Sequence, residues 1–151
     1  MENKEAFEVV MQSDSKELTI MANIIKDKYE FEITQKPTQG LLMFRVEESV
    51  ELMDFNAGEI LVTTCEAKIN KSLGYAMVMG INNEKALNNA IVMSVYESDL
   101  PEKNEIENLI MKLKDDQKNK MIEEREIINS TTVRFETMGG QDTGVSHNKI
   151  K

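Results

Sequence analysis

The residue types that perform covalent chemistry are scarce in this chain. It contains one cysteine, Cys65, and one histidine, His147, which lies in a polar stretch far along the chain. A cysteine–histidine nucleophile pair requires both side chains within hydrogen-bond reach, and we do not expect a residue of such a tail to meet Cys65. A structural zinc ion takes four nitrogen or sulfur ligands, more than these two residues supply. The sequence therefore predicts no thiol nucleophile and no metal site.

Carboxylates are plentiful, but their spacing is typical of a solvated surface. One group lies within residues 47–51 after a predicted strand, and a second, within 123–126, lies in a charged predicted helix. The glycines do not match the spacing of either phosphate-binding loop motif. A stand-alone hydrolase that uses Glu59 or Glu66 stays open as an alternative, and the spacing of the other residues does not favour it.

Composition narrows the class of protein. The 151 residues are enough for one domain with a core, and 40% of them are hydrophobic. The net charge of −9 argues against a nucleic-acid interface, because phosphate contacts need clustered lysine and arginine. No window holds the roughly 20 apolar residues of a membrane span, and the acidic first residues are unlike a signal peptide. One cysteine allows no internal disulfide and fits a reducing compartment, so we expect a cytoplasmic protein.

The first part of the chain predicts a pair of helices. Residues 5–11 carry apolar side chains at helical spacing. Asp14 and Glu17 have the spacing of a capping box, which satisfies unpaired amides at the start of a helix. The apolar face of the following helix consists of Leu18, Met21, Ile24 and Ile25. We therefore expect an N-terminal helical hairpin.

Alternation of apolar and polar residues then predicts strands. Residues 29–33 form the first strand, Pro37 and Gly40 interrupt it, and residues 41–46 resume the pattern as a second strand. A third strand runs over residues 58–69, with one mainly buried face and one polar face. These segments predict a mainly antiparallel sheet.

A short loop at residues 70–72 predicts that the chain turns back as a hairpin. The returning strand alternates large side chains with small ones. The small side chains are Gly74, Ala76, Val78 and Gly80. A face of small residues lets a second backbone approach closely. That backbone can belong to this domain or to another subunit, and we expect the small face to dock on another subunit.

Two further helices and a final strand complete the expected elements. Asn82 and Asn83 cap a mostly apolar helix that continues to about Tyr96. A second helix begins at residues 100–101, where proline is tolerated in the first turn, and residues 133–137 alternate as a last short strand. The apolar stripe of that second helix is formed by Ile106, Leu109, Ile110, Leu113 and Met121.

The predicted fold class is α+β, a mainly antiparallel sheet with helices packed on one face. We expect residues 1–142 to form a single domain. Residues 143–151 show no periodicity, and we expect them to be a disordered tail.

The order of four segments resembles a known family. These segments are KPTQGLLMFR, GEILVTTCEAKI, LGYAMVMG with its following helix, and TTVRFETMG. Together they resemble the G subunit of the bacterial carbon–phosphorus lyase core complex over most of the chain. The resemblance implies an accessory subunit. In this family the displacement of adenine from ATP by the phosphonate is thought to centre on the larger I subunit. The other core subunits, chiefly the I subunit, are therefore the expected partners.

The resemblance also implies a reaction. The family's G subunit supports transfer of the ribose triphosphate moiety of ATP to methylphosphonate, with loss of adenine. ATP and the phosphonate would be substrates of the complex, and we expect this chain itself to bind no cofactor. An alternative function, of a different class, is that of an acidic protein-interaction or regulatory module without phosphonate chemistry.

Individual positions both match the family and depart from it. The matching positions, which we expect at subunit contacts, are Arg45, Gly58, Glu59, Thr63, Lys68, Gly74, Gly80 and Thr137. The family usually has arginine where this chain has Gln35, Thr64, Ile81 and Gly140. Arginine binds phosphate through a bidentate fork, so these departures argue against a direct grip on a triphosphate by this chain.

Overall fold

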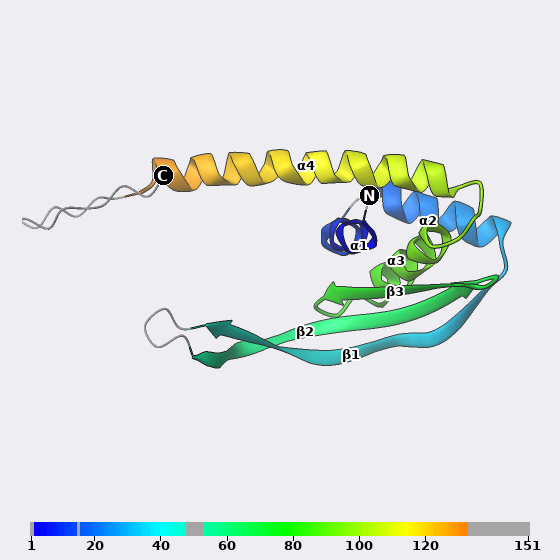
Figure 1. The fold of residues 1–151 in the computed structure, drawn as a ribbon, viewed down its shortest axis with the longest axis horizontal. Helices are drawn as coiled ribbons and strands as arrows, with labels where there is room; N and C mark the ends of the chain where they lie inside the picture. Colours follow the sequence, from blue (N-terminus) through cyan, green and yellow to red (C-terminus); the bar gives the residue numbers. More distant parts are fainter. Residues whose placement is uncertain (1, 15, 48–52, 133–151) are drawn as a thin grey trace, which may run out of the picture.

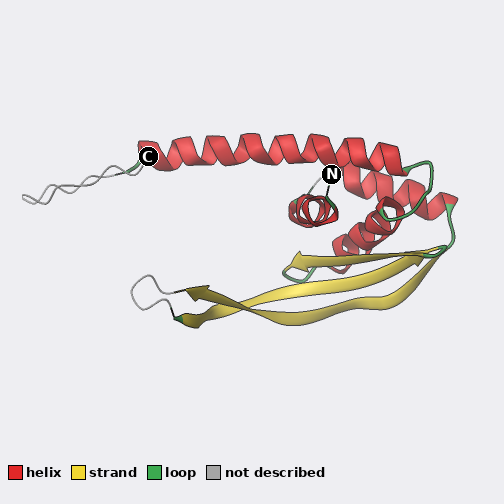
Figure 2. Cartoon of the chain, in the orientation of Figure 1, coloured by secondary structure: helices red, strands yellow, loops and turns green. Residues whose placement is uncertain are grey.

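The computed structural model describes residues 2–14, 16–47 and 53–132 of the chain. Within these ranges, four helices pack beside a three-stranded antiparallel sheet with strand order β1-β2-β3 (Figures 1 and 2). The fold is α+β, as the sequence predicts. None of the described helices combines the length and the apolar character that crossing a membrane requires. The predicted last strand, residues 133–137, lies outside the described residues.

The predicted N-terminal helical pair is present as α1 (Asn3–Gln12) and α2 (Lys16–Lys28). The Nδ2 atom of Asn89 donates to the backbone oxygen of Val10 at 3.1 Å, which fixes α1 to the helix layer. The two carboxylates of the predicted capping box also reach other helices. Asp14 pairs with Lys85 at 2.6 Å, and Glu17 pairs with Lys112 at 2.7 Å.

The sheet is dominated by one long hairpin. Strand β1 (Phe31–Glu47) pairs antiparallel with β2 (Asp54–Ile69) along its length, and β3 (Ser72–Met79) pairs with the second half of β2. The prediction of two separate strands at residues 29–33 and 41–46 is therefore wrong. The register shifts twice between Ile33 and Thr38, and such irregularities accommodate Pro37, which has no N–H to give to a sheet.

The predicted hairpin between β2 and β3 is confirmed. Asn70 adopts a φ of 54° in the turn, a left-handed conformation that asparagine tolerates better than most residues. The predicted buried face of β2 is confirmed as well, because Thr63, Cys65, Ala67 and Ile69 are all buried.

Helix α3 (Asn83–Tyr96) begins where the sequence predicts, with the Asn82 side chain accepting from the backbone N–H of Lys85 at 3.0 Å. Helix α4 (Lys103–Ser130) begins two residues after Pro101, slightly later than predicted. Its stripe is buried at Ile106, Ile110 and Leu113 but exposed at Met121. The second half of α4 therefore leaves the body of the protein, as Figure 1 shows.

The small face of β3 is covered by α3 of the same chain. Gly74, Ala76 and Val78 are buried, and an added Cβ at Gly74 would lie 2.0 Å from the backbone oxygen of Ala90 and 2.2 Å from the Ser94 nitrogen. The backbones of β3 and α3 thus meet directly. The prediction that this face docks on another subunit is wrong at Gly74, because the close approach lies inside the fold.

The junction of α2 and β1 is tied to the start of α4 by a buried carboxylate. Glu102 accepts hydrogen bonds from the Lys28 ammonium and from the Tyr29 hydroxyl, the latter at 2.7 Å. The hydrogen bond from Lys28, followed by that from Tyr29, lowers the pKa of Glu102 to about 2. We call these three residues the Glu102 clamp.

A methyl group at Gly74 is expected to destabilise the fold. Gly74→Ala requires α3 to move away from β3, and overpacking of this kind typically costs about 1–3 kcal/mol. Thermal unfolding followed by circular dichroism should show a melting temperature lower by about 2–10 °C. Gly40→Ala is the matched control, because an added Cβ there meets no atom within 4 Å. Equal melting temperatures for the two variants would contradict the direct backbone contact.

The Glu102 clamp is expected to make stability depend on acid pH. The pKa of Glu102 is lowered from 4.5 in the unfolded chain to about 2 in the fold. The contribution of the ionised Glu102 carboxylate to the free energy of unfolding is therefore complete above about pH 4.5, and it is lost as the pH falls towards 2. Glu102→Gln should lower the melting temperature at pH 7, and the difference from wild type should shrink below pH 4.5. Glu105→Gln, at an exposed position of the same helix, is the control. A difference in melting temperature between Glu102→Gln and wild type that stays constant with pH would contradict the lowered pKa of Glu102.

Candidate functional site

Metal chemistry and thiol chemistry have little support among the described residues. No group of three or more histidine, cysteine, aspartate or glutamate residues in these ranges could hold a metal ion. Cys65 is fully buried, and its thiol donates to the backbone oxygen of Gln35 at 3.3 Å. Burial, followed by the nearby Glu66 carboxylate, raises the pKa of the Cys65 thiol, which disfavours the reactive thiolate. His147, the other candidate, lies outside the described residues.

A polar hollow lies between the turn after α1 and the start of α3. Its lining includes Asp14, Asn82, Lys85 and Asn88. Two lysines, Lys16 and Lys85, line the hollow, and Lys85 pairs with Asp14. The Asn88 side chain accepts from Lys26 at 2.5 Å. These contacts join the N-terminal helices to α3.

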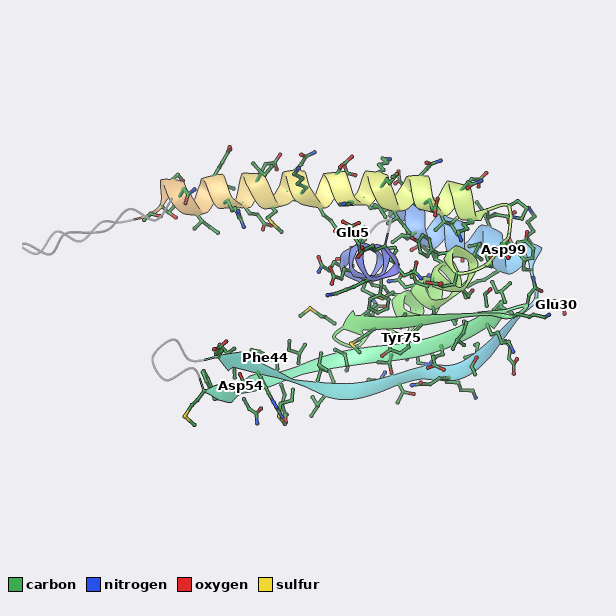
Figure 3. All side chains as sticks on the ribbon, viewed as in Figure 1. Glu5, Glu30, Phe44, Asp54, Tyr75 and Asp99 are labelled. Carbon is green, nitrogen blue, oxygen red and sulfur yellow. The ribbon has the colours of Figure 1, made fainter. Side chains whose placement is uncertain are left out.

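The most unusual surface belongs to the end of the long hairpin. We call residues 41–47 of β1 and 54–61 of β2 the ribbon, because β3 does not extend alongside them (Figure 1). Figure 3 places Phe44 and Asp54 at this far end, well away from the helix layer. The ribbon is therefore a two-stranded projection from a three-stranded sheet.

Both faces of the ribbon carry exposed apolar side chains. The register places Leu41, Met43 and Leu61 on the face that α3 covers elsewhere, and Leu42, Phe44 and Ile60 on the opposite face. Leu41 is 65% exposed and Leu42 is 44% exposed. A water-facing sheet normally alternates apolar with polar residues, and an isolated two-stranded hairpin is marginally stable at best. This surface is therefore suited to burial by another chain.

The second half of α4 has the same character. At Gln117 the helix still contacts α1, because the Gln117 side chain donates to the backbone oxygen of Val9 at 2.9 Å. Beyond it, the exposed apolar residues are Met121, Ile122, Ile127 and Ile128. We call residues 118–130 the helix arm. The ribbon and the helix arm project from the same end of the protein (Figure 1).

Two of the family-matching positions hold the turn between β3 and α3. The buried Thr63 hydroxyl donates to the backbone oxygen of Gly80 at 2.7 Å and accepts from the backbone N–H of Asn82 at 3.2 Å. Gly80 has a φ of 76°, a conformation that favours glycine. Thr63 and Gly80 thus set where α3 begins, as Gly74 sets how closely it packs.

Two other matching positions lie on the ribbon. Gly58 faces Phe44, and an added Cβ there would lie 3.1 Å from the Phe44 ring. Glu59 lies next to it, opposite Met43, and is exposed. Glycine at position 58 therefore leaves room for an aromatic ring across the strand. Thr137, a further matching position, lies outside the described residues.

The two matching cations do not come together. Arg45 pairs with Asn56 at the far end of the ribbon, whereas Lys68 pairs with Glu32 near the other end of the sheet. The 12 residues of β2 between Asn56 and Lys68 (68 − 56) extend about 40 Å at the usual strand rise. Arg45 and Lys68 therefore cannot hold one phosphate chain together.

Two of the four positions that carry arginine in the family are neighbours in this fold. The Gln35 side chain donates to the Thr64 hydroxyl at 3.2 Å across β1 and β2. Ile81 is exposed in the turn before α3, and Gly140 lies outside the described residues. An uncharged hydrogen bond thus joins two of the positions where the resemblance led us to expect arginine.

Sequence reasoning missed the ribbon as a functional surface. Its signal is the run Leu41-Leu42-Met43-Phe44, because four consecutive apolar residues in a strand indicate that both faces become covered. Apolar and polar residues alternate in the neighbouring segments, which favoured the interpretation that only one face of this strand is buried.

Comparison with curated proteins finds none that matches the chain. Comparison with protein families finds one match, to the family described as phosphonate metabolism protein PhnG, which covers residues 1–140. That range contains every described element as well as the matching positions discussed above. The chain therefore belongs to the PhnG family and has a role in phosphonate metabolism.

Proposed function

We propose that this chain is an accessory subunit of the carbon–phosphorus lyase core complex. In this role it supports transfer of the ribose triphosphate moiety of ATP to methylphosphonate, without a complete active site of its own. The observation that carries the proposal is the ribbon, whose two apolar faces are both exposed. A free protein that exposes such apolar surface to water is prone to aggregate, whereas a protein that assembles with partners buries it.

The ribbon and the helix arm together suit a stable interface. Specific interfaces bury about 1,200–2,000 Å² in total, and their centres are rich in aromatic residues and methionine. Phe44, Phe55 and Met43 supply these residue types on the ribbon, and Met121 supplies one on the helix arm. The partner we propose for the faces of the ribbon is chiefly the I subunit.

The substrates are assigned to the partner subunits. The two matching cations, Arg45 on β1 and Lys68 on β2, lie near opposite ends of the β1–β2 hairpin. Gln35 and Thr64 form an uncharged pair where the resemblance led us to expect arginine. Triphosphate binding generally uses converging arginine, lysine or backbone N–H groups. We therefore propose that this chain binds no cofactor itself and that the complex works in the cytoplasm, where ATP is supplied.

Charges on the ribbon are expected to prevent assembly without unfolding the chain. Leu41→Asp and Leu42→Asp place a carboxylate on opposite faces, and both positions are exposed in the free protein. After co-expression with the other core subunits, at least one variant should lose most of its capture of the I subunit. Ile24→Asp is the control, because Ile24 is 49% exposed on α2, in the body of the protein. Full capture by both ribbon variants, with unchanged melting curves, would refute the assigned surface.

The isolated chain is expected to have no catalytic activity. Purified alone with ATP and methylphosphonate, it should release no adenine above the rate without protein, because the two matching cations, Arg45 and Lys68, do not converge on one phosphate chain. The assembled complex, measured by the same chromatographic assay, should release adenine. Turnover by the isolated chain that Glu59→Gln abolishes would instead favour the hydrolase alternative.

A further inference from the structure

A β-bulge near the tip of the ribbon decides which side chains lie on each of its faces. The register shifts between Phe44 and Arg45, and Ala57 is the extra residue on β2. An extra residue moves the later side chains of a strand to the opposite face. The face directed away from the helices is therefore apolar throughout, and its residues are Leu42, Phe44, Val46, Phe55, Gly58 and Ile60. All charged residues of the ribbon lie on the opposite face, which we call the mixed face.

Carboxylates outnumber cations on the mixed face. Glu47 and Asp54 are direct cross-strand partners there, and Glu59 lies nearer the body of the protein. Arg45 is the one cation among the described residues of the ribbon. Like charges directly opposite each other destabilise a strand pair, and within residues 2–14, 16–47 and 53–132 no ion pair involves Glu47 or Asp54. The mixed face is therefore suited to a partner that brings positive charge.

In the body of the protein, a single helix spans the layer between α4 and the sheet. Helix α1 contacts α4 through the ion pair of Glu5 with Lys114, at 2.5 Å. The same helix contacts the sheet through Met11, whose Sδ atom lies 3.3 Å from the backbone nitrogen of Met77 on β3. Figure 1 shows no described helix or strand beyond α1 in this layer, between the helix arm and the ribbon. We call this part the open layer, and its depth is that of one helix.

The helix arm and the mixed face are the two walls of the open layer. The side of the helix arm that faces the layer continues from Gln117, which contacts α1. At the spacing of the helical repeat, Met121, Glu124 and Ile128 share that side, whereas Lys120 lines a hollow at the turn between α1 and α2. Glu124 thus adds a further carboxylate. The exposed apolar residues of the two walls are Met121 and Ile128 on the helix arm, and Leu41, Met43 and Leu61 on the ribbon.

We propose that one helix of a partner protein occupies the open layer. Its apolar side chains contact Met43 on one wall and Met121 on the other, and its lysine or arginine side chains reach Glu47 and Asp54. A helix packed against apolar surfaces is a common mode of recognition, and complementary charge adds specificity. This inference rests on the proposed function, because the helix belongs to one of the other core subunits.

The distribution of charge along the ribbon sets the sides of the partner helix. The pair of Leu41 and Leu61 lies next to the body of the protein, whereas the pair of Glu47 and Asp54 lies at the far end (Figure 3). The side of the partner helix directed at α1 is therefore apolar, and the side directed away from the body is basic. Such a helix is amphipathic, and it leaves the apolar face of the ribbon available for a second contact with the core subunits.

The first experiment identifies the occupant by photocrosslinking. A benzophenone side chain replaces Met43 on the ribbon or Met121 on the helix arm, and the full chain is co-expressed with the other core subunits. Both positions are exposed, so the fold tolerates the change. After irradiation, mass spectrometry should find both positions attached to the same segment of one partner protein, at the three- or four-residue spacing of a helix. The same replacement of Ile24, exposed on α2, is the control and should not label that segment.

The crosslinks also separate this inference from the proposed function. Attachment to two different proteins, to a second copy of this chain or to residues 133–151 of the chain itself would overturn the inference. Attachment to partner residues at the alternating spacing of a strand would overturn it as well. If the chain captures the I subunit but neither position is labelled, the inference fails and the proposed function stands. If the chain captures no core subunit, both fail.

The second experiment tests the charge of the partner helix. Asp54→Lys and Glu59→Lys reverse a charge on the mixed face, and Asp27→Lys makes the same change at an exposed position of α2. With unchanged melting temperatures, the two mixed-face variants should capture at least about tenfold less partner than wild type at physiological salt. Asp27→Lys should capture as much as wild type. Equal capture by Asp54→Lys and Asp27→Lys would show that no basic side lies at the tip of the ribbon and would overturn the proposal.

Discussion

The close contact between β3 and α3 at Gly74 is the constraint on which the arrangement depends. Because the two backbones meet without an intervening side chain, α3 lies flat on the sheet and covers Cys65, Ala67 and Val78. Thr63 and Gly80 determine where that helix starts. The N-terminal helices and α4 then pack around α3, and the chain forms one continuous core. The matching positions Thr63, Gly74 and Gly80 are therefore explained by this architecture.

Much of the fold could be predicted because its signals are local. The turn at Asn70, the cap at Asn82 and the buried face of β2 each depend on neighbouring residues, and each agrees with the structure. Pro37 was misleading because a register shift, which involves both strands of a pair, lets β1 continue past it. The small face was correctly identified as a close approach, but periodicity cannot say whether the approaching backbone belongs to the same chain.

The candidate site was less predictable than the fold. Exposure of Leu41 or Met121 depends on where β3 and the helix layer stop, and that is a property of the whole arrangement. The same reasoning applies to Gln35 and Thr64, which are 29 residues apart in sequence and hydrogen-bonded in the sheet. Nothing local in the sequence pairs them, because only the register of β1 and β2 brings them together.

The way α4 is held has a mechanical consequence. Its first turns are held by the Glu102 clamp and by the buried Ile106, Ile110 and Leu113, and the Gln117 side chain donates to the backbone of α1. The 13 residues from Gln117 to Ser130 (130 − 117) then extend about 20 Å and are supported at one end only. A tilt of about 10° at its root displaces its tip by about 3 Å at that length. The spacing between the helix arm and the ribbon can therefore adjust to a bound chain while the core stays unchanged.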